Sequence, residues 1–172
     1  MPNAVTHVLL AIILVDLIRD YYLKKKHKNY ITLYTLFIAG VAGLLPDIDV
    51  PLNWILSSNI ELLKHGWITH TLMFSLIFLF IGLYFWNKEK HKLSFYFFVI
   101  SFGIFLHLLL DFLLGGGRYE GIMWLWPLSS ETFKLHLLSK LNLNNIPAAL
   151  DAIILLAWLY HEEVKHKIKD YI

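Results

Sequence analysis

The sequence contains no cysteine, which excludes a disulfide scaffold, thiolate metal ligands and thiol nucleophiles. Charged residues are scarce, at 16% of 172 residues against about 25% in a typical soluble domain. Apolar residues make up 58%, so the chain is too hydrophobic to be intrinsically disordered. The net charge is only +2, and no basic stretch interleaved with aromatic residues lies on a polar background. Nucleic-acid binding is therefore not expected.

Large apolar side chains are abundant, with 12 Phe, 9 Tyr and 6 Trp, and a lipid bilayer is their natural solvent. Five apolar segments stand out, at residues 4–18, 30–45, 71–86, 93–114 and 147–160. They are too long for strands and lack period-two alternation, so each is predicted to be a helix. Only one comfortably reaches the roughly 20 residues of a straight span. We expect one all-α domain over residues 1–172, a polytopic transmembrane helical bundle with about five spans.

Basic residues alternate along the chain and indicate a topology. Eleven of the 15 Lys and Arg residues lie within residues 19–28, 88–92 and 165–169. With five spans these regions share one side, which the positive-inside rule places in the cytoplasm. We therefore expect a multi-pass protein of the cell membrane, with its N-terminus outside and its C-terminus in the cytoplasm. The first residues carry no positive charge and no small-residue cleavage site follows, so a cleaved signal peptide is not expected.

Side chains that can bind metals recur where these segments meet the outer face. They come from four separate regions and are His7, Asp47, Asp49, His65, His70, His107 and Asp111. Only Lys and Arg were used to set the topology, so the gathering of imidazoles and carboxylates at one face is a semi-independent result. The sequence predicts a metal site near the extracytoplasmic face.

The spacing of these residues suits a shared cation. His107 and Asp111 are four apart, so on a helix they share one face, where both bind one ion or Asp111 orients His107. Asp47 and Asp49 are two apart in a turn after Pro46, and they can act as ligands or bridge two ions. Imidazole with carboxylate and no thiolate favours Zn²⁺, Mn²⁺ or iron over Ca²⁺ or Mg²⁺. Such ions acidify water and polarise phosphoryl oxygens, so hydrolysis is the expected chemistry.

Each residue also has a simpler structural explanation. A lone His7 on an apolar helix is usually a hydrogen-bonded core residue, and an Asp-x-Asp turn is usually a helix cap or Asx-turn. His107 and Asp111 could be a buried pair that joins two helices. Ionisable groups within spans are nevertheless rare, costly and usually functional, so the joint metal site is favoured.

Other polar residues are expected to have structural roles. Asp16 is predicted to pair with Arg19, and Asp151 to favour the N-terminus of the last helix. Four histidines in the basic regions are expected to be solvated: His27, His91, His161 and His166. Gly115 to Gly117 and Arg118 form either an anion clamp or, slightly favoured, a simple helix stop. Two further residues of the same outer loop could add ligands, Glu131 and His136.

The motifs together resemble the YdjM-like family of membrane-bound, metal-dependent hydrolases. The pattern comprises Thr6-His7, the turn 45–49 (Leu-Pro-Asp-Ile-Asp), Thr69-His70, the element 107–111 (His-Leu-Leu-Leu-Asp) and Trp126-Pro127. The family is thought to be distantly similar to zinc-dependent phospholipase C and P1-type nucleases. That resemblance implies phosphoester hydrolysis, with a lipid headgroup as one possible target, and is an analogy at the level of the fold.

The expected function is a membrane-bound hydrolase that cleaves a phosphoester of a lipid or lipid-linked substrate through a metal-activated water. His7, Asp47, Asp49, His70, His107 and Asp111 would hold one to three divalent ions, Zn²⁺ first among them. Asp47 or Asp49 would serve as general base, and His65 as a further ligand or general acid. The alternatives are a transport or regulatory protein that binds metal without catalysis, and a structural protein whose His and Asp residues only link helices.

Overall fold

The computed structural model describes residues 4–23, 30–56, 65–114, 121–135, 137–140 and 147–166. This part of the chain is helical apart from its turns and a single antiparallel bridge between Ile122 and Phe133, so the all-α prediction is confirmed. The long helices are α1 (Ala4–Leu17), α3 (Leu33–Ala42), α5 (Leu72–Asn87), α6 (His91–Leu114) and α8 (Pro147–His166). The short ones are η1 (Ile18–Tyr22), η2 (Pro46–Ile48), α4 (Asp49–Leu56), η4 (Ile68–His70) and α7 (Leu137–Lys140).

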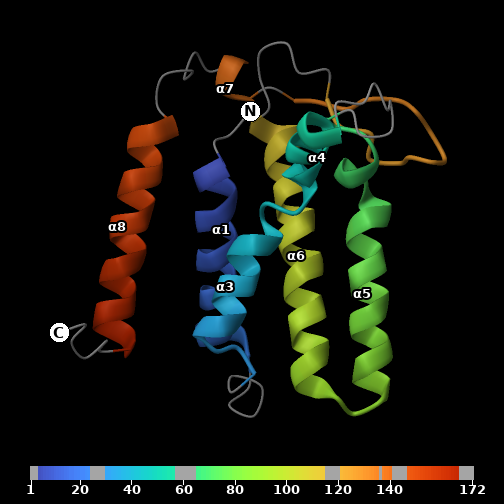
Figure 1. The fold of residues 1–172 in the computed structure, drawn as a ribbon. Coiled ribbons are helices and arrows are strands. Elements are labelled where there is room, and N and C mark those ends of the chain that lie inside the picture. The colour runs from blue at the N-terminus through green and yellow to red at the C-terminus, as the bar shows by residue number, and fades with distance from the viewer. Residues whose placement is uncertain are drawn as a thin grey trace.

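The long helices stand side by side and alternate in direction (Figure 1). α6 packs against α1, α3 and α5, whereas α8 packs against α1. The start of α1 and the end of α6 lie at the same end as α4, and the end of α8 lies at the other. The start of α1, the start of α5 and the end of α6 therefore meet at one end, as the proposed site requires.

Among the described helices, only α6 has by itself the length and hydropathy of a membrane span. α3 and the segment Pro46–Leu56 pass the same test only as a pair, bent by 54° at the break between them. α5 is apolar but shorter. The expectation of about five spans thus stays a prediction, which we take up below.

Local sequence explains where the helices begin. Thr32 and Thr35 form a reciprocal capping box at the start of α3, and the Thr71 hydroxyl accepts a hydrogen bond from the Phe74 amide at the start of α5.

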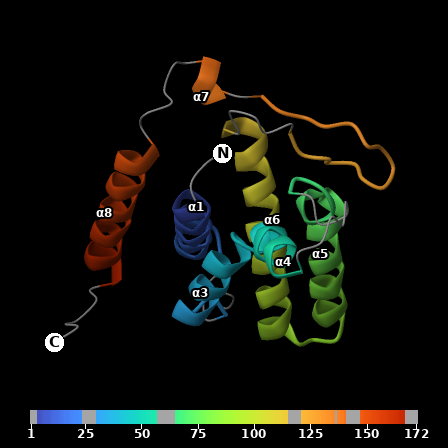
Figure 2. The same ribbon diagram turned by 45° about the horizontal axis from the view of Figure 1, so that its top comes forward.

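Residues 121–135 extend across the end of α6 and past α5 (Figure 2). The Leu72 amide donates to the Trp124 carbonyl at 3.1 Å, which fixes this segment above α5.

Two glycines allow α1, α3 and α6 to approach closely. A Cβ atom on Gly103 would lie 2.7 Å from the Cβ of Ala42, and one on Gly43 would lie 2.8 Å from the backbone oxygen of His7. Any larger residue would separate these helices, as in other packings through small residues. The close approach places His7 and the Gly43 carbonyl beside α6.

Polar contacts attach α8 to α1 at both ends. The Thr6 hydroxyl donates to Asp151 at 2.8 Å, near the N-terminal ends of the two helices. Near the other end, Arg19 pairs with Asp16, as the sequence predicts, and Trp158 Nε1 donates to Asp16 at 3.3 Å. Both carboxylates are buried, so these contacts compensate for their desolvation.

Thr6→Val tests this attachment, because it keeps the shape of the side chain and removes the donor to buried Asp151. We expect a loss of about 1–3 kcal/mol in the free energy of opening α8, since a buried acceptor is left unpaired. Hydrogen exchange of the α8 amides in detergent measures it. Thr132→Val, at an exposed residue, is the matched control. Equal α8 exchange in both variants would show that this bond does not hold the helix.

The prediction of solvated histidines is wrong for two of the four. His161 is half-buried, with Nε2 3.3 Å from Asp20 Oδ2, and His91 is half-buried against Trp86, with ring centroids 4.6 Å apart. His27 lies outside the described residues. Sequence offers no sign of these contacts, because both depend on packing against another helix.

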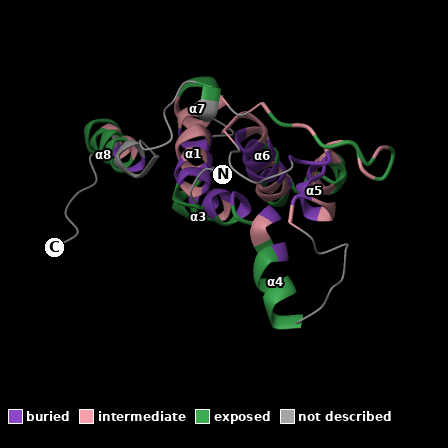
Figure 3. Cartoon of the chain, turned by 90° about the horizontal axis from the view of Figure 1, so that it is seen from above, coloured by how far each residue is buried: buried purple, intermediate pink, exposed green. Residues whose placement is uncertain are grey.

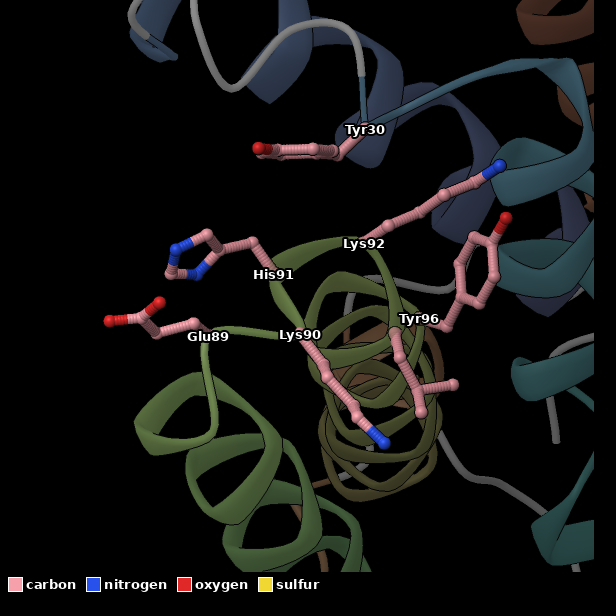
Figure 4. A pocket seen from close by; sticks show the side chains of 7 residues that line it. Tyr30, Glu89, Lys90, His91, Lys92 and Tyr96 are labelled. Atoms are coloured by element: carbon pink, nitrogen blue, oxygen red, sulfur yellow. The ribbon is translucent and has the colours of Figure 1, made fainter.

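The basic end of the bundle, where α5 ends and α6 begins near Lys88, Lys90 and Lys92, holds a hollow of about 530 Å³ (Figure 4). It is lined by Tyr30, by Lys90 in the turn between α5 and α6, and by Lys92 and Tyr96 of α6. The hollow lies at the start of α6, whereas His107 is 16 residues further on, about 24 Å along the helix axis. It is therefore separate from the candidate site.

Candidate metal centre

The structure brings together all seven of the residues that the sequence singles out. His7 comes from α1, and Asp47 and Asp49 from η2 and the first turn of α4. His65 and His70 lie just before α5, and His107 and Asp111 lie on α6. The turn predicted after Pro46 is a 3₁₀-helix that continues directly into α4. We call these seven residues the His/Asp cluster.

Four atoms form the centre of the cluster: His70 Nε2, His107 Nε2, Asp47 Oδ1 and Asp111 Oδ2. The two imidazole nitrogens are 3.3 Å apart. His107 Nε2 lies 3.5 Å from Asp47 Oδ1 and 3.2 Å from Asp111 Oδ2. His70 Nε2 lies 3.6 Å from both carboxylate oxygens.

The surrounding contacts fix the tautomers of both imidazoles. His107 Nδ1 donates to the Gly43 carbonyl at 2.7 Å, and a carbonyl can only accept. His70 Nδ1 lies 3.1 Å from Thr69 Oγ1 and 3.3 Å from Asp49 Oδ2. The Thr69 hydroxyl itself donates to Asp49, so His70 Nδ1 must be the donor to this pair. Each neutral imidazole therefore directs the Nε2 lone pair toward the other.

As long as both imidazoles are neutral, the centre consequently consists of four acceptors with no hydrogen between them. Asp47 Oδ1 and both oxygens of Asp111 are buried without a hydrogen bond of good geometry. Buried unpaired acceptors are costly, and a shared cation removes the cost. The donor set of two imidazoles and two carboxylates suits Zn²⁺. Ligands of a tetrahedral zinc ion lie about 3.3–3.6 Å from one another, which agrees with the distances above. The residues therefore fit a divalent metal.

The rest of the cluster extends this centre. His7 stacks on His107 with ring centroids 3.9 Å apart, and its Nε2 lies 3.3 Å from Asp111 Oδ1. His65 Nδ1 lies 3.1 Å from Asp49 Oδ1 and 3.9 Å from Asp47 Oδ1. Two groups of three donors result, one on the His7 side and one on the His65 side. The arrangement has donors for more than one ion.

The carboxylates also govern the protonation of the cluster. Burial lowers the pKa of His70, but hydrogen bonds with Asp47 and Asp49 outweigh it and raise the pKa to about 9. His70 lies in η4, before α5 begins. When no metal is bound, a proton on His70 thus supplies the positive charge that four acceptors require. Metal binding displaces that proton.

Burial is uneven across the cluster. The side chains of His7, Asp49, His70, His107 and Asp111 are at most 2% exposed, whereas those of His65 and Asp47 are 25% and 28% exposed. The cluster therefore has one accessible side, formed by Asp47 and His65. A substrate or water molecule would approach a bound ion from this side.

Among the further candidates of the outer loop, the structure describes only Glu131. Glu131 is exposed, and none of the described contacts of the cluster involves it. Arg118 and His136 lie outside the described residues. Sequence reasoning missed two supporting groups, the Thr69 hydroxyl and the Gly43 carbonyl. The neighbouring Thr-His pair is a signal for Thr69, but a backbone carbonyl leaves none.

Comparison with known proteins gives one match. No curated protein and no solved structure matches the chain significantly. The model of a family described as YdjM inner membrane protein matches residues 1–167. The match covers nearly the whole sequence and includes every residue of the His/Asp cluster, so the resemblance seen in the motifs is confirmed. The chain belongs to the YdjM inner membrane protein family.

Proposed function

We propose that this membrane protein is a metal-dependent phosphoester hydrolase. The observation that carries the proposal is the set of four buried atoms, from His70, His107, Asp47 and Asp111, that converge and are all acceptors when both imidazoles are neutral. The family supports a location in the membrane. The alternating helices and the basic end of the bundle support about five spans, with the cluster near the extracytoplasmic face.

The residues of the cluster would divide the work. A divalent ion held here supplies Lewis acidity toward water and phosphoryl oxygens. Asp47, at the accessible side, can accept a proton from the attacking water. His65 is held by Asp49 at 3.1 Å and is placed to donate a proton to the leaving group. Asp49 positions both His65 and His70 through its two oxygens.

A membrane lipid or lipid-linked phosphoester is the proposed substrate class. Long apolar helices surround the cluster, and its one open side lies among apolar residues of α3 and α4. A substrate embedded in the bilayer can reach such a site without leaving the membrane.

Hydrolysis is tested with purified protein loaded with zinc, using generic phosphomonoester and phosphodiester substrates. We expect turnover, and a loss of about 100-fold or more in kcat for His65→Gln at unchanged metal content, since general acids contribute about 10²–10⁴-fold. His91→Gln, a half-buried histidine at the other end of α6, is the matched control. Full metal content without hydrolysis of either substrate class would contradict the proposal.

A second candidate is a metal-binding protein that transports or senses the ion without catalysis. The near-complete burial of His70, His107 and Asp111 favours it, because a substrate has little room to contact an ion that these side chains enclose. Metal uptake into sealed vesicles, measured beside hydrolysis, separates the two functions. Uptake without turnover would support transport.

A further inference from the structure

A groove of about 790 Å³ runs from the accessible side of the His/Asp cluster along the ends of α3 and α4. Its polar end is formed by Asp47 and His65, the two cluster residues that are not buried. Val41, Leu44, Ile48 and Val50 are among the apolar residues that line the rest. The volume lies in the range of small-molecule sites, about 300–1,000 Å³.

The apolar walls of this groove face outward. Val41 is 46% exposed, Ile48 43% and Val50 54%. Such residues in a water-filled cleft would be unfavourable, whereas hydrocarbon would cover them at no cost. The groove thus combines a wall suited to a lipid chain with one polar end at the candidate metal centre.

α4 explains why the groove opens sideways. It is bent by 54° from α3 and, seen from above, extends away from the other helices (Figure 3). Trp54 and Ile55 on α4 are 84% and 71% exposed. Large apolar side chains on a helix at the end of a membrane bundle are typical of an interfacial segment. The groove beside α4 is therefore bordered by surface that a bilayer would cover.

We propose that this groove takes one hydrocarbon chain of a membrane lipid phosphoester, which enters sideways from the bilayer and places its phosphoryl group at Asp47 and His65. The inference rests on the proposed function and deepens it, by naming the kind of substrate and the residues that select it. A soluble phosphoester would need the polar end alone and would gain nothing from the apolar walls.

Chain-length dependence provides the first test. Each buried methylene is worth about fourfold in binding, so kcat/KM rises with acyl length until the groove is filled. Val41→Trp fills part of the groove and lowers the ratio of long-chain to short-chain turnover at least tenfold. Val164→Trp makes the same change at an exposed residue of α8 and leaves the ratio unchanged. If Val41→Trp and Val164→Trp give the same ratio of long-chain to short-chain turnover, the proposal is overturned.

Photo-crosslinking tests the groove even if no hydrolysis is found. The protein is placed in vesicles of phosphatidylethanolamine and phosphatidylglycerol with a phospholipid that carries a diazirine on its acyl chain. Mass spectrometry is expected to find Val41, Leu44 and Ile48 labelled several-fold more than Val164, and Val41→Trp to lower the labelling of Leu44 and Ile48. Labelling without turnover would refute the hydrolase and keep the lipid groove. Equal labelling of Ile48 and Val164 would refute the groove, whatever the enzyme activity.

Discussion

His107→Ala is expected to lower metal affinity more than about 100-fold, because groups that only support a ligand already cost 10–100-fold when removed. His107 makes three of the closest contacts of the centre, to Asp47, Asp111 and His70. Its loss also leaves the Gly43 carbonyl without its donor. Metal content after gentle purification, measured by mass spectrometry, checks this result.

Two further variants show whether the loss is specific. Asp49→Ala removes the partner of His65 and His70 and is expected to weaken metal binding about 10–100-fold, less than the loss of His107. His91→Ala changes a half-buried histidine at the start of α6, at the opposite end of the bundle and in none of the described groups of possible metal donors, and is expected to keep full metal content. Wild-type protein that carries no metal and takes none up would rule out the centre.

Removal of metal by a chelator is expected to lower the Tm on the order of 10 °C. An ion present at 1,000 times its Kd stabilises the folded state by about 4 kcal/mol. For a chain of this size, each kcal/mol moves the Tm by about 2–4 °C. Thermal unfolding in detergent, with zinc or with chelator, measures the shift.

Asp111→Asn is the informative control for this shift. The side-chain amide of this variant places a hydrogen among the acceptor atoms of the centre. Repulsion between these atoms therefore destabilises the metal-free variant little, while its affinity for metal falls. We expect its Tm to be the same with and without chelator. A chelator shift in Asp111→Asn as large as in the wild type would place the stabilising ion elsewhere. No shift in either protein, with added zinc equally without effect, would favour a purely structural role for the cluster.

The helices were predictable because the long apolar segments are too long for strands and lack period-two alternation. Residues 71–86 and 93–114 predict α5 and α6 to within two residues at each end. α4 was not predictable, because eight residues with Pro51 in the first turn are too few for a periodic apolar stripe. That omission matters, since α4 forms one side of the groove.

Only the parts of the site that follow from residue spacing along one helix and from pairs of opposite charge could be predicted from the sequence. His107 and Asp111 share a helix face at four-residue spacing, and Asp16 meets Arg19 three residues on. Contacts between distant residues leave no local pattern. His107 is 64 residues from Gly43, and Trp158 is 142 residues from Asp16. The orientation of each imidazole depends on such contacts, so it required the structure.

The division of the His/Asp cluster among α1, the η2–α4 corner, η4 and α6 sets the order of events during biosynthesis. His7 is synthesised first and Asp111 last. A nascent chain that ends before α6 holds at most five of the seven donors and lacks His107 and Asp111, two of the four central ones. The complete centre can therefore form only after the ribosome has passed residue 111 and α6 has joined its neighbours, whereas the three donors Asp47, His65 and His70 are synthesised before α6. α8 contributes no donor to this cluster, so metal loading need not await its synthesis.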